Sequence, residues 1–196
     1  MAARYGAHEV MEVHEVLSKS IDASNIFQTL RPQVQDPELG SMVDNHLQFM
    51  TQEYDNLVRT VSQNGANEAI PYSGPKNVSP QYGLNSPETQ RPNASSRQLN
   101  DRDIASIVLG CHKSSASHRM MAALECADPQ LRRTIQQGAI NCAEQAYDVW
   151  SYMNDKGHYQ VPTMKDMTTN TMVNAYGPAP VTQGHGFQQS YPAPGH

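Results

Sequence analysis

Two stretches, QDPELGSMVDNHLQFMTQEYDNLV (residues 35–58) and ADPQLRRTIQQGAINCAEQAYDVW (residues 127–150), carry the strongest structural signal in the chain. Both contain Asp-Pro-x-Leu near their start and Tyr-Asp near their end. An Asp before a Pro favours the start of a helix, because the carboxylate caps free N–H groups and Pro is tolerated in the first turn. Each stretch also follows a segment with helical periodicity. The sequence therefore predicts two helical hairpins, either duplicated or built twice with the same capping chemistry.

Four segments repeat apolar residues every three or four positions, which is the period of an amphipathic helix. They cover about residues 7–30, 37–61, 101–127 and 128–157, and Pro32, Asn64-Gly65 and Gly157 are the predicted ends of three of them. The predicted core faces are Val10, Val13, Leu17, Ile21, Ser24 and Phe27; Val43, Leu47, Met50, Tyr54, Leu57 and Val61; Ile104, Val108, Cys111, Ser115, His118, Ala122 and Glu125, with Ile107 and Met121 alongside; and Leu131, Ile135, Gly138, Cys142, Ala146, Val149 and Met153.

The stretch NGANEAIPYSGPKNVSPQYGLNSPETQRPNASS (residues 64–96) separates the two hairpins. Its prolines at 71, 75, 80, 87 and 92 exclude a long helix. A helix of about 25 residues is about 38 Å long, and about 12 extended residues cover that distance. The stretch can therefore run back along a whole helix, as the long crossover of ferritin-like folds does.

These patterns predict an all-α protein, a ferritin-like four-helix bundle with a flexible C-terminal tail. Its predicted segments are a first hairpin (1–65), a crossover linker (66–100), a second hairpin (101–160) and a low-complexity tail (161–196). The end of the tail, GPAPVTQGHGFQQSYPAPGH, shows no helical or strand period. We expect it to be disordered or ordered by a partner. Exposed tyrosines could support self-assembly; the candidates are Tyr5, Tyr72, Tyr82, Tyr176 and Tyr191.

The composition excludes several classes of protein. Apolar residues make up 38% and charged residues 17%, which indicates a folded core with irregular polar segments. The net charge of −5, without a basic cluster, argues against non-specific nucleic-acid binding. The chain shows no stretch approaching 18 apolar residues and no secretory signal at its start. Cys111, Cys126 and Cys142 form no CxxC motif, so we expect thiols in a reducing compartment, with Cys111 and Cys142 buried.

The stretch HEVMEVHEVL (residues 8–17) raises the question of a metal site. A zinc-protease helix needs two His four residues apart, and here the fourth residue after His8 is Glu12. That spacing excludes the protease motif. The acidic side of this segment, with Glu12 and Glu15, is either a solvated face or a docking surface.

A di-metal centre in a ferritin-like bundle needs Glu on two helices and Glu-x-x-His on the other two. The chain contains no Glu-x-x-His. A degenerate site of Glu53, His118 and Glu125 stays open, as does plain burial of His118 and Glu125 beside Tyr54 or Gln145. The chain also lacks Gly-x-Ser-x-Gly and a glycine-rich phosphate loop. We therefore expect no catalytic residue, no cofactor and no metal site.

The second hairpin, from LNDRDIAS (starting at residue 99) to GHYQVP (ending at residue 162), resembles the bacterial spore coat protein F family over about 60 residues. The features that carry the resemblance are Asp101 and Asp103, the small residues around Lys113 to Ser117, Glu125 before Asp-Pro-x-Leu-Arg, Tyr152-Met153, and Lys156-Gly157-x-Tyr159-x-x-Pro162.

The resemblance implies a ferritin-like bundle and a structural, non-enzymatic role in the endospore coat, after synthesis in the mother-cell cytoplasm. The implied partners are other coat proteins and further copies of the chain. Two alternatives stay open. One is a ferritin-like metal-binding or redox protein, and the other is a soluble regulatory adaptor that binds through the linker and the tail.

Overall fold

The computed structural model describes residues 5–62, 69–74, 79–95, 97 and 99–179. The chain divides into two compact units, Met1–Pro162 and Thr163–His196. The first unit holds α1 (Ala7–Leu30), the short 3-10 helix η1 (Arg31–Gln33), α2 (Pro37–Ser62), α3 (Asp101–Leu124) and α4 (Pro129–Asp155). The second unit holds α5 (Asp166–Val173). Among the described residues, extended pairing is limited to isolated β-bridges and there is no strand. The predicted all-helical class is therefore confirmed.

Local capping chemistry sets the helix boundaries. Asp128 accepts hydrogen bonds from the N–H groups of Gln130 and Leu131, with Pro129 in the first turn, as the sequence predicts. At the other end of α4, Gly157 has φ +72° and the N–H of His158 donates to the carbonyl of Met153 at 2.7 Å. This bond closes a Schellman cap, which requires a left-handed residue and therefore favours glycine.

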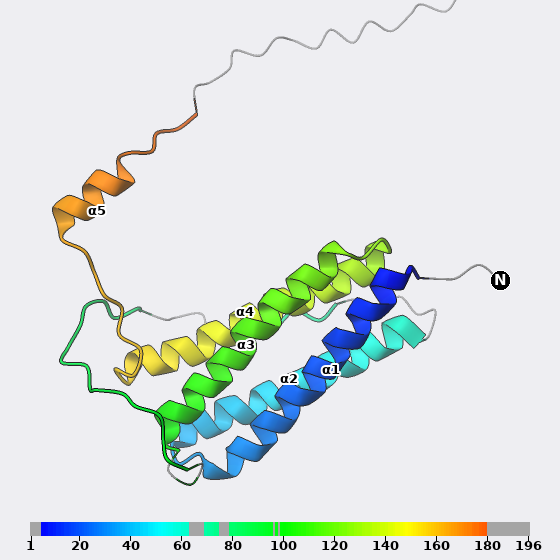
Figure 1. The fold of residues 1–196 in the computed structure, drawn as a ribbon, viewed down its shortest axis with the longest axis horizontal. Helices are drawn as coiled ribbons and strands as arrows, with labels where there is room; N and C mark the ends of the chain where they lie inside the picture. The colour runs from blue at the N-terminus through cyan, green and yellow to red at the C-terminus, as the bar shows by residue number, and fades with distance from the viewer. Residues whose placement is uncertain (1–4, 63–68, 75–78, 96, 98, 180–196) are drawn as a thin grey trace, which may run out of the picture. The chain divides into compact units, whose positions relative to one another are not determined.

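The four long helices pair in opposite directions. Figure 1 shows α1 antiparallel to α2 and α3 antiparallel to α4, with the end of α2 and the start of α3 at opposite ends of the packed helices. The crossover between them follows α4, because the Tyr72 N–H donates to the Asn141 side chain and the Gln81 N–H donates to the Asn154 side chain. The sequence order of the crossover thus matches the order of its partners along α4.

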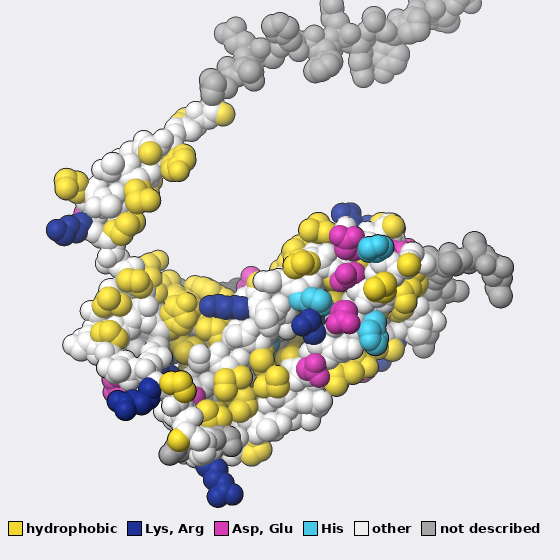
Figure 2. Space-filling model, in the orientation of Figure 1, with side chains coloured by type: hydrophobic (Ala, Val, Ile, Leu, Met, Phe, Trp, Pro, Cys, Tyr) yellow, Lys and Arg dark blue, Asp and Glu magenta, His cyan; other side chains and the backbone are white. Residues whose placement is uncertain are grey.

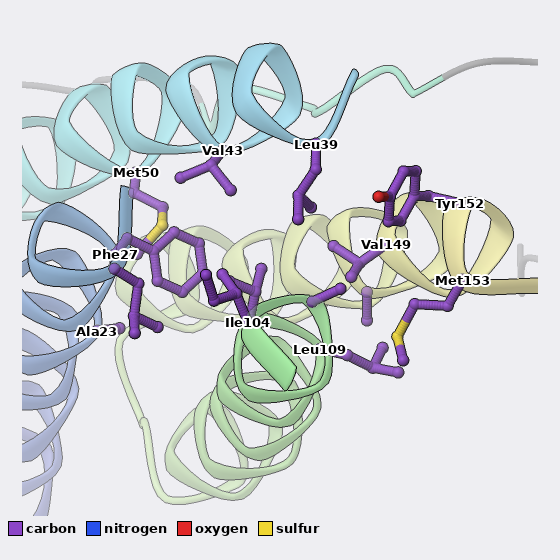
Figure 3. Packing of buried hydrophobic residues seen from close by; sticks show 14 residues of the cluster. Ala23, Phe27, Leu39, Val43, Met50, Ile104, Leu109, Val149, Tyr152 and Met153 are labelled. Atoms are coloured by element: carbon purple, nitrogen blue, oxygen red, sulfur yellow. The ribbon is translucent and has the colours of Figure 1, made fainter. Parts of the chain in front are cut away.

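All four helices contribute to one large apolar cluster. Phe27, Leu39, Ile104 and Val149 are each fully buried in it, and Figure 3 shows them pointing into the same space. A second cluster joins Val13, Val16, Leu57, Ala122, Ala123, Cys126, Leu131 and Ile135. The predicted core face of α4 is confirmed, since all seven of its members are buried.

The predicted core face of α1 is only partly correct. Val13 and Phe27 are buried, but Val10 and Ile21 are 55% and 45% exposed. Apolar residues lie on two sides of α1, so periodicity alone could not choose between them. The buried side instead carries Val16, Ser20 and Ala23, with Glu9 also inside. Glu9 is accommodated because its carboxylate accepts the N–H of Gly6 and the N–H of Asp128, each at 2.6 Å.

On α2 and α3, polar residues are more deeply buried than predicted. His46, Glu53 and Thr60 are buried on α2, whereas the predicted Leu47, Tyr54 and Val61 are half-buried. Along α3 and just after its end, three predicted residues, Cys111, His118 and Glu125, each lie one position before the residue that is buried. The buried residues are His112, Arg119 and Cys126. All three cysteines are free thiols; Cys142 is buried as predicted, and Cys111 is half-buried.

The second unit contains a short helix that the sequence analysis did not predict. Residues Asp166–Val173 form α5, and every residue of it is exposed. Residues 180–196, including Phe187 and Tyr191, lie outside the described part of the chain. Across the described residues, the helices are too polar or too short to form a membrane span.

Candidate functional site

Polar side chains from all four long helices meet inside the apolar core. On three helices they come in pairs seven residues apart, a spacing that returns a side chain to the same helix face after two turns. We call this group the polar centre; its members are Ser20 of α1, His46 and Glu53 of α2, His112 and Arg119 of α3, and Asn141, Gln145 and Asp148 of α4.

Two histidines connect α3 through α2 to the crossover. His112 Nε2 lies 3.1 Å from His46 Nδ1, and His46 Nε2 lies 3.1 Å from the Tyr72 hydroxyl. That hydroxyl donates to the Asp148 carboxylate at 2.6 Å. Since the hydroxyl has one proton and donates it to Asp148, His46 must donate to the hydroxyl from Nε2. These contacts link His112 of α3 through His46 of α2 to Tyr72 and Asp148.

Burial lowers the pKa of His112 well below its usual range, and the neighbouring His46 and Arg119 lower it further. Burial raises the pKa of the Tyr72 hydroxyl, and the hydrogen bond to Asp148 raises it further. Tyr72 therefore stays protonated and remains a donor to Asp148.

A buried cation occupies the other half of the polar centre. Arg119 Nη1 lies 3.7 Å from Glu53 Oε2, and Arg119 Nη2 donates to the Ser20 hydroxyl at 3.0 Å. Gly138 makes room for this guanidinium, because a Cβ there would overlap it. Burial nevertheless raises the pKa of Glu53, against the opposing effects of Arg119 and the hydrogen bond from Asn141.

Side chains of α4 hold the main chain of the crossover. Asn141 accepts the N–H of Tyr72 at 2.8 Å and donates to the carbonyl of Ile70 at 2.7 Å. Asn154 makes both bonds to one residue, accepting the N–H of Gln81 at 2.7 Å and donating to its carbonyl at 3.0 Å. These bonds supply partners for peptide groups that an irregular segment would otherwise leave unpaired. Asn141 of the polar centre and Asn154 near the end of α4 thus fasten the crossover to that helix.

Comparisons with known proteins identify relatives of the chain. The family model described as the Coat F domain matches residues 100–162, which cover α3 and α4. Spore coat protein F-like protein YhcQ of Bacillus subtilis (strain 168) is 30% identical over 191 residues, covering 94% of this chain and 88% of the relative. The chain belongs to the spore coat protein F family. No solved structure matches this coat F chain.

The residues of the suggested degenerate metal site lie apart in this coat F protein. Glu53 is in the polar centre, whereas Glu125 is exposed, with Oε2 3.9 Å from His8 Nδ1. His118 is half-buried, and its Nε2 is buried without a hydrogen-bond partner, so its expected pairing with Tyr54, Gln145 or Glu125 is wrong. Across the described residues, no cluster of three or more His, Cys, Asp or Glu side chains could hold a metal ion.

One other expectation changes, and one group of residues was not predicted. Tyr72 is half-buried and bonded to the polar centre of the coat F fold, so it is not an exposed residue available for assembly. His46, His112, Arg119 and Asp148 were not predicted as a group. The available signal was the seven-residue spacing of polar residues within one helix, as between His112 and Arg119. Hydropathy favours apolar or small residues for a core, so the prediction placed neighbouring residues there instead.

Proposed function

We propose that this coat F protein is a structural component of the bacterial endospore coat, where it acts through contacts with other coat proteins and with copies of itself. The observation that carries the proposal is the similarity to YhcQ, whose name describes a spore coat protein F-like protein, over 94% of the chain. Its place would be the spore coat, after synthesis in the mother cell.

The geometry of the polar centre supports a structural role. Most of its side chains bond to one another or to the crossover. The cavity beside Ser20, His112 and Arg119 has a volume of about 20 Å³. A cavity of about 10–15 Å³ is enough for one water molecule, so there is room for water but not for an organic substrate. These features favour a structural role for the polar centre.

We further propose that the helices form a ferritin-like bundle, with segments 1–65, 66–100, 101–160 and 161–196 as the building blocks. The two antiparallel hairpins and the crossover along α4 support this topology. Arg119 places a permanent positive charge beside Glu53, where a bound metal ion would be repelled. We expect purified protein to carry no stoichiometric metal. A content near one ion per chain that is lost in Glu53→Gln would contradict this.

The role in the coat is tested by location. The protein is fused to a fluorescent reporter at its own locus in the spore-forming host, and the same reporter alone is expressed from the same promoter as a control. We expect the fusion to form a shell around the developing spore and to be recovered in coat extracts, while the reporter alone stays diffuse. A fusion that stays diffuse in the mother cell, or accumulates inside the forespore, would overturn the proposal.

A further inference from the structure

The small cavity beside the polar centre lies between α1 and α3, and we call it the α1–α3 cavity. Its volume is about 20 Å³, and one water molecule needs about 10–15 Å³, so it has room for a single water molecule or a single monatomic ion. Among the described residues, no aspartate or glutamate lines it. The polar or charged lining side chains are Lys19, Ser20, His112, Ser115, His118 and Arg119.

Arg119 brings more hydrogen-bond donors to this cavity than the protein satisfies. A guanidinium has five N–H groups, and Arg119 donates one hydrogen bond to a described residue, from Nη2 to the Ser20 hydroxyl at 3.0 Å, which leaves four. The ion pair of Arg119 with Glu53 is 3.7 Å long, beyond hydrogen-bond distance. Arg119 is only 8% exposed, so bulk water cannot readily supply the missing acceptors.

Other lining groups add to this excess of donors. Lys19 contributes a positive charge and three N–H groups. His118 Nε2 is buried and makes no hydrogen bond with a described residue. Glu12 and Glu15 lie near His118 but do not line the cavity. Figure 2 shows histidine, basic and acidic side chains gathered on the face formed by α1 and α3.

We propose that the α1–α3 cavity binds a small inorganic anion of the size of chloride. An anion accepts hydrogen bonds and donates none, so it suits a lining with spare donors, whereas a water molecule also has protons to place. The charges of Lys19 and Arg119 favour the anion, and the low dielectric beside a buried guanidinium strengthens the attraction. Lys19 is exposed and Ser115 is half-buried, so the cavity lies near the surface, where an ion can exchange with solvent.

A bound anion would connect two helices. Lys19 and Ser20 belong to α1, whereas Ser115, His118 and Arg119 belong to α3, so the ion would add contacts to the bond between Arg119 and Ser20. These groups come together only when α1 and α3 are packed. The ion should therefore bind the folded state and stabilise it as its concentration rises. This inference goes beyond the proposed role in the coat and does not depend on it.

Thermal unfolding of the full-length protein in sodium chloride and in sodium gluconate, at equal ionic strength, tests the proposal. Gluconate carries the same charge, but it is an organic anion too large for a cavity of about 20 Å³. We expect a higher melting temperature in chloride. Above the dissociation constant, each tenfold rise in chloride should increase the ratio of folded to unfolded protein about tenfold.

Two substitutions locate the ion. Lys19→Met and Ser115→Ala change lining side chains that are exposed or half-buried, so both proteins should fold. We expect each to lose most of the difference in melting temperature between chloride and gluconate. The matched control is Lys113→Met, which removes an exposed lysine of α3 that does not line the cavity. This control should keep the difference.

The outcomes separate an anion from water. Equal melting temperatures in chloride and gluconate would overturn anion binding and leave the cavity to water. A chloride-specific rise that survives in both Lys19→Met and Ser115→Ala would overturn the α1–α3 cavity as the location. A crystal grown in bromide instead of chloride gives a direct readout, because bromide is identified by its anomalous scattering. We expect a bromide peak beside Arg119, and a water molecule in its place would overturn the proposal.

Discussion

Replacing Tyr72 with Phe should destabilise the protein far more than a surface substitution would. The change removes one hydroxyl and keeps the ring, so the packing against His46 and Phe49 is retained. The lost hydroxyl donates to Asp148 at 2.6 Å and lies 3.1 Å from His46 Nε2. Asp148 is only 4% exposed, so water cannot readily replace the donor. A hydrogen bond to a charged group contributes about 1.5–3 kcal/mol and a neutral one about 0.5–1.5 kcal/mol.

We therefore expect the free energy of unfolding to fall by about 2–4 kcal/mol, or the melting temperature by about 4–16 °C for a protein of this size. Urea denaturation followed by circular dichroism measures the loss, and the denaturant dependence should not change. The control Tyr82→Phe removes the hydroxyl of an exposed residue and should cost less than about 0.5 kcal/mol.

A double-mutant cycle identifies the partner. In an Asp148→Ala background, the carboxylate no longer needs a donor, so Tyr72→Phe should cost less than about 1.5 kcal/mol. The reasoning is refuted if Tyr72→Phe is as mild as Tyr82→Phe, or if it costs the same with and without the Asp148 carboxylate.

Further predictions concern acid stability, the helix ends and the tail. Because the pKa of His112 is lowered in the folded state, its contribution to stability is complete above its ordinary value of 6.5 and falls as the pH drops below it. The slope should approach about 1.4 kcal/mol per pH unit, and His112→Gln should flatten it in urea titrations at several pH values. Gly157→Ala places a side chain at φ +72° and should lower the free energy of unfolding by about 1 kcal/mol. Gly110→Ala, in open space on α3, should raise it by about 0.5–1 kcal/mol. Equal effects of the two substitutions in urea denaturation would contradict this. Removing everything after Pro178 should leave the melting temperature nearly unchanged but reduce recovery in assembled material, and a large drop in melting temperature would show that the tail packs on the helices.

Local chemistry in the sequence was enough to predict where the four long helices begin, and where α1, α2 and α4 end. The segment 7–30 was predicted and Ala7–Leu30 is observed, while Asp128-Pro129 and Gly157 mark the two ends of α4. These boundaries depend on caps, prolines and a left-handed glycine, which act within a few residues of the chain. The length of the crossover likewise follows from the sequence alone, since it needs only the dimensions of a helix and an extended chain.

Only the tertiary structure decided which side of α1 and α3 is buried and what the buried polar groups bond to. On α3 the apolar pattern selects His118 for the core, but the buried residue is Arg119, because Glu53 of α2 and the space at Gly138 of α4 accommodate its guanidinium. His46 and His112 are 66 positions apart in the chain, and their bond exists only because the helices pack. Burying such groups is unfavourable unless partners are present, and a partner supplied by another helix cannot be identified from local periodicity.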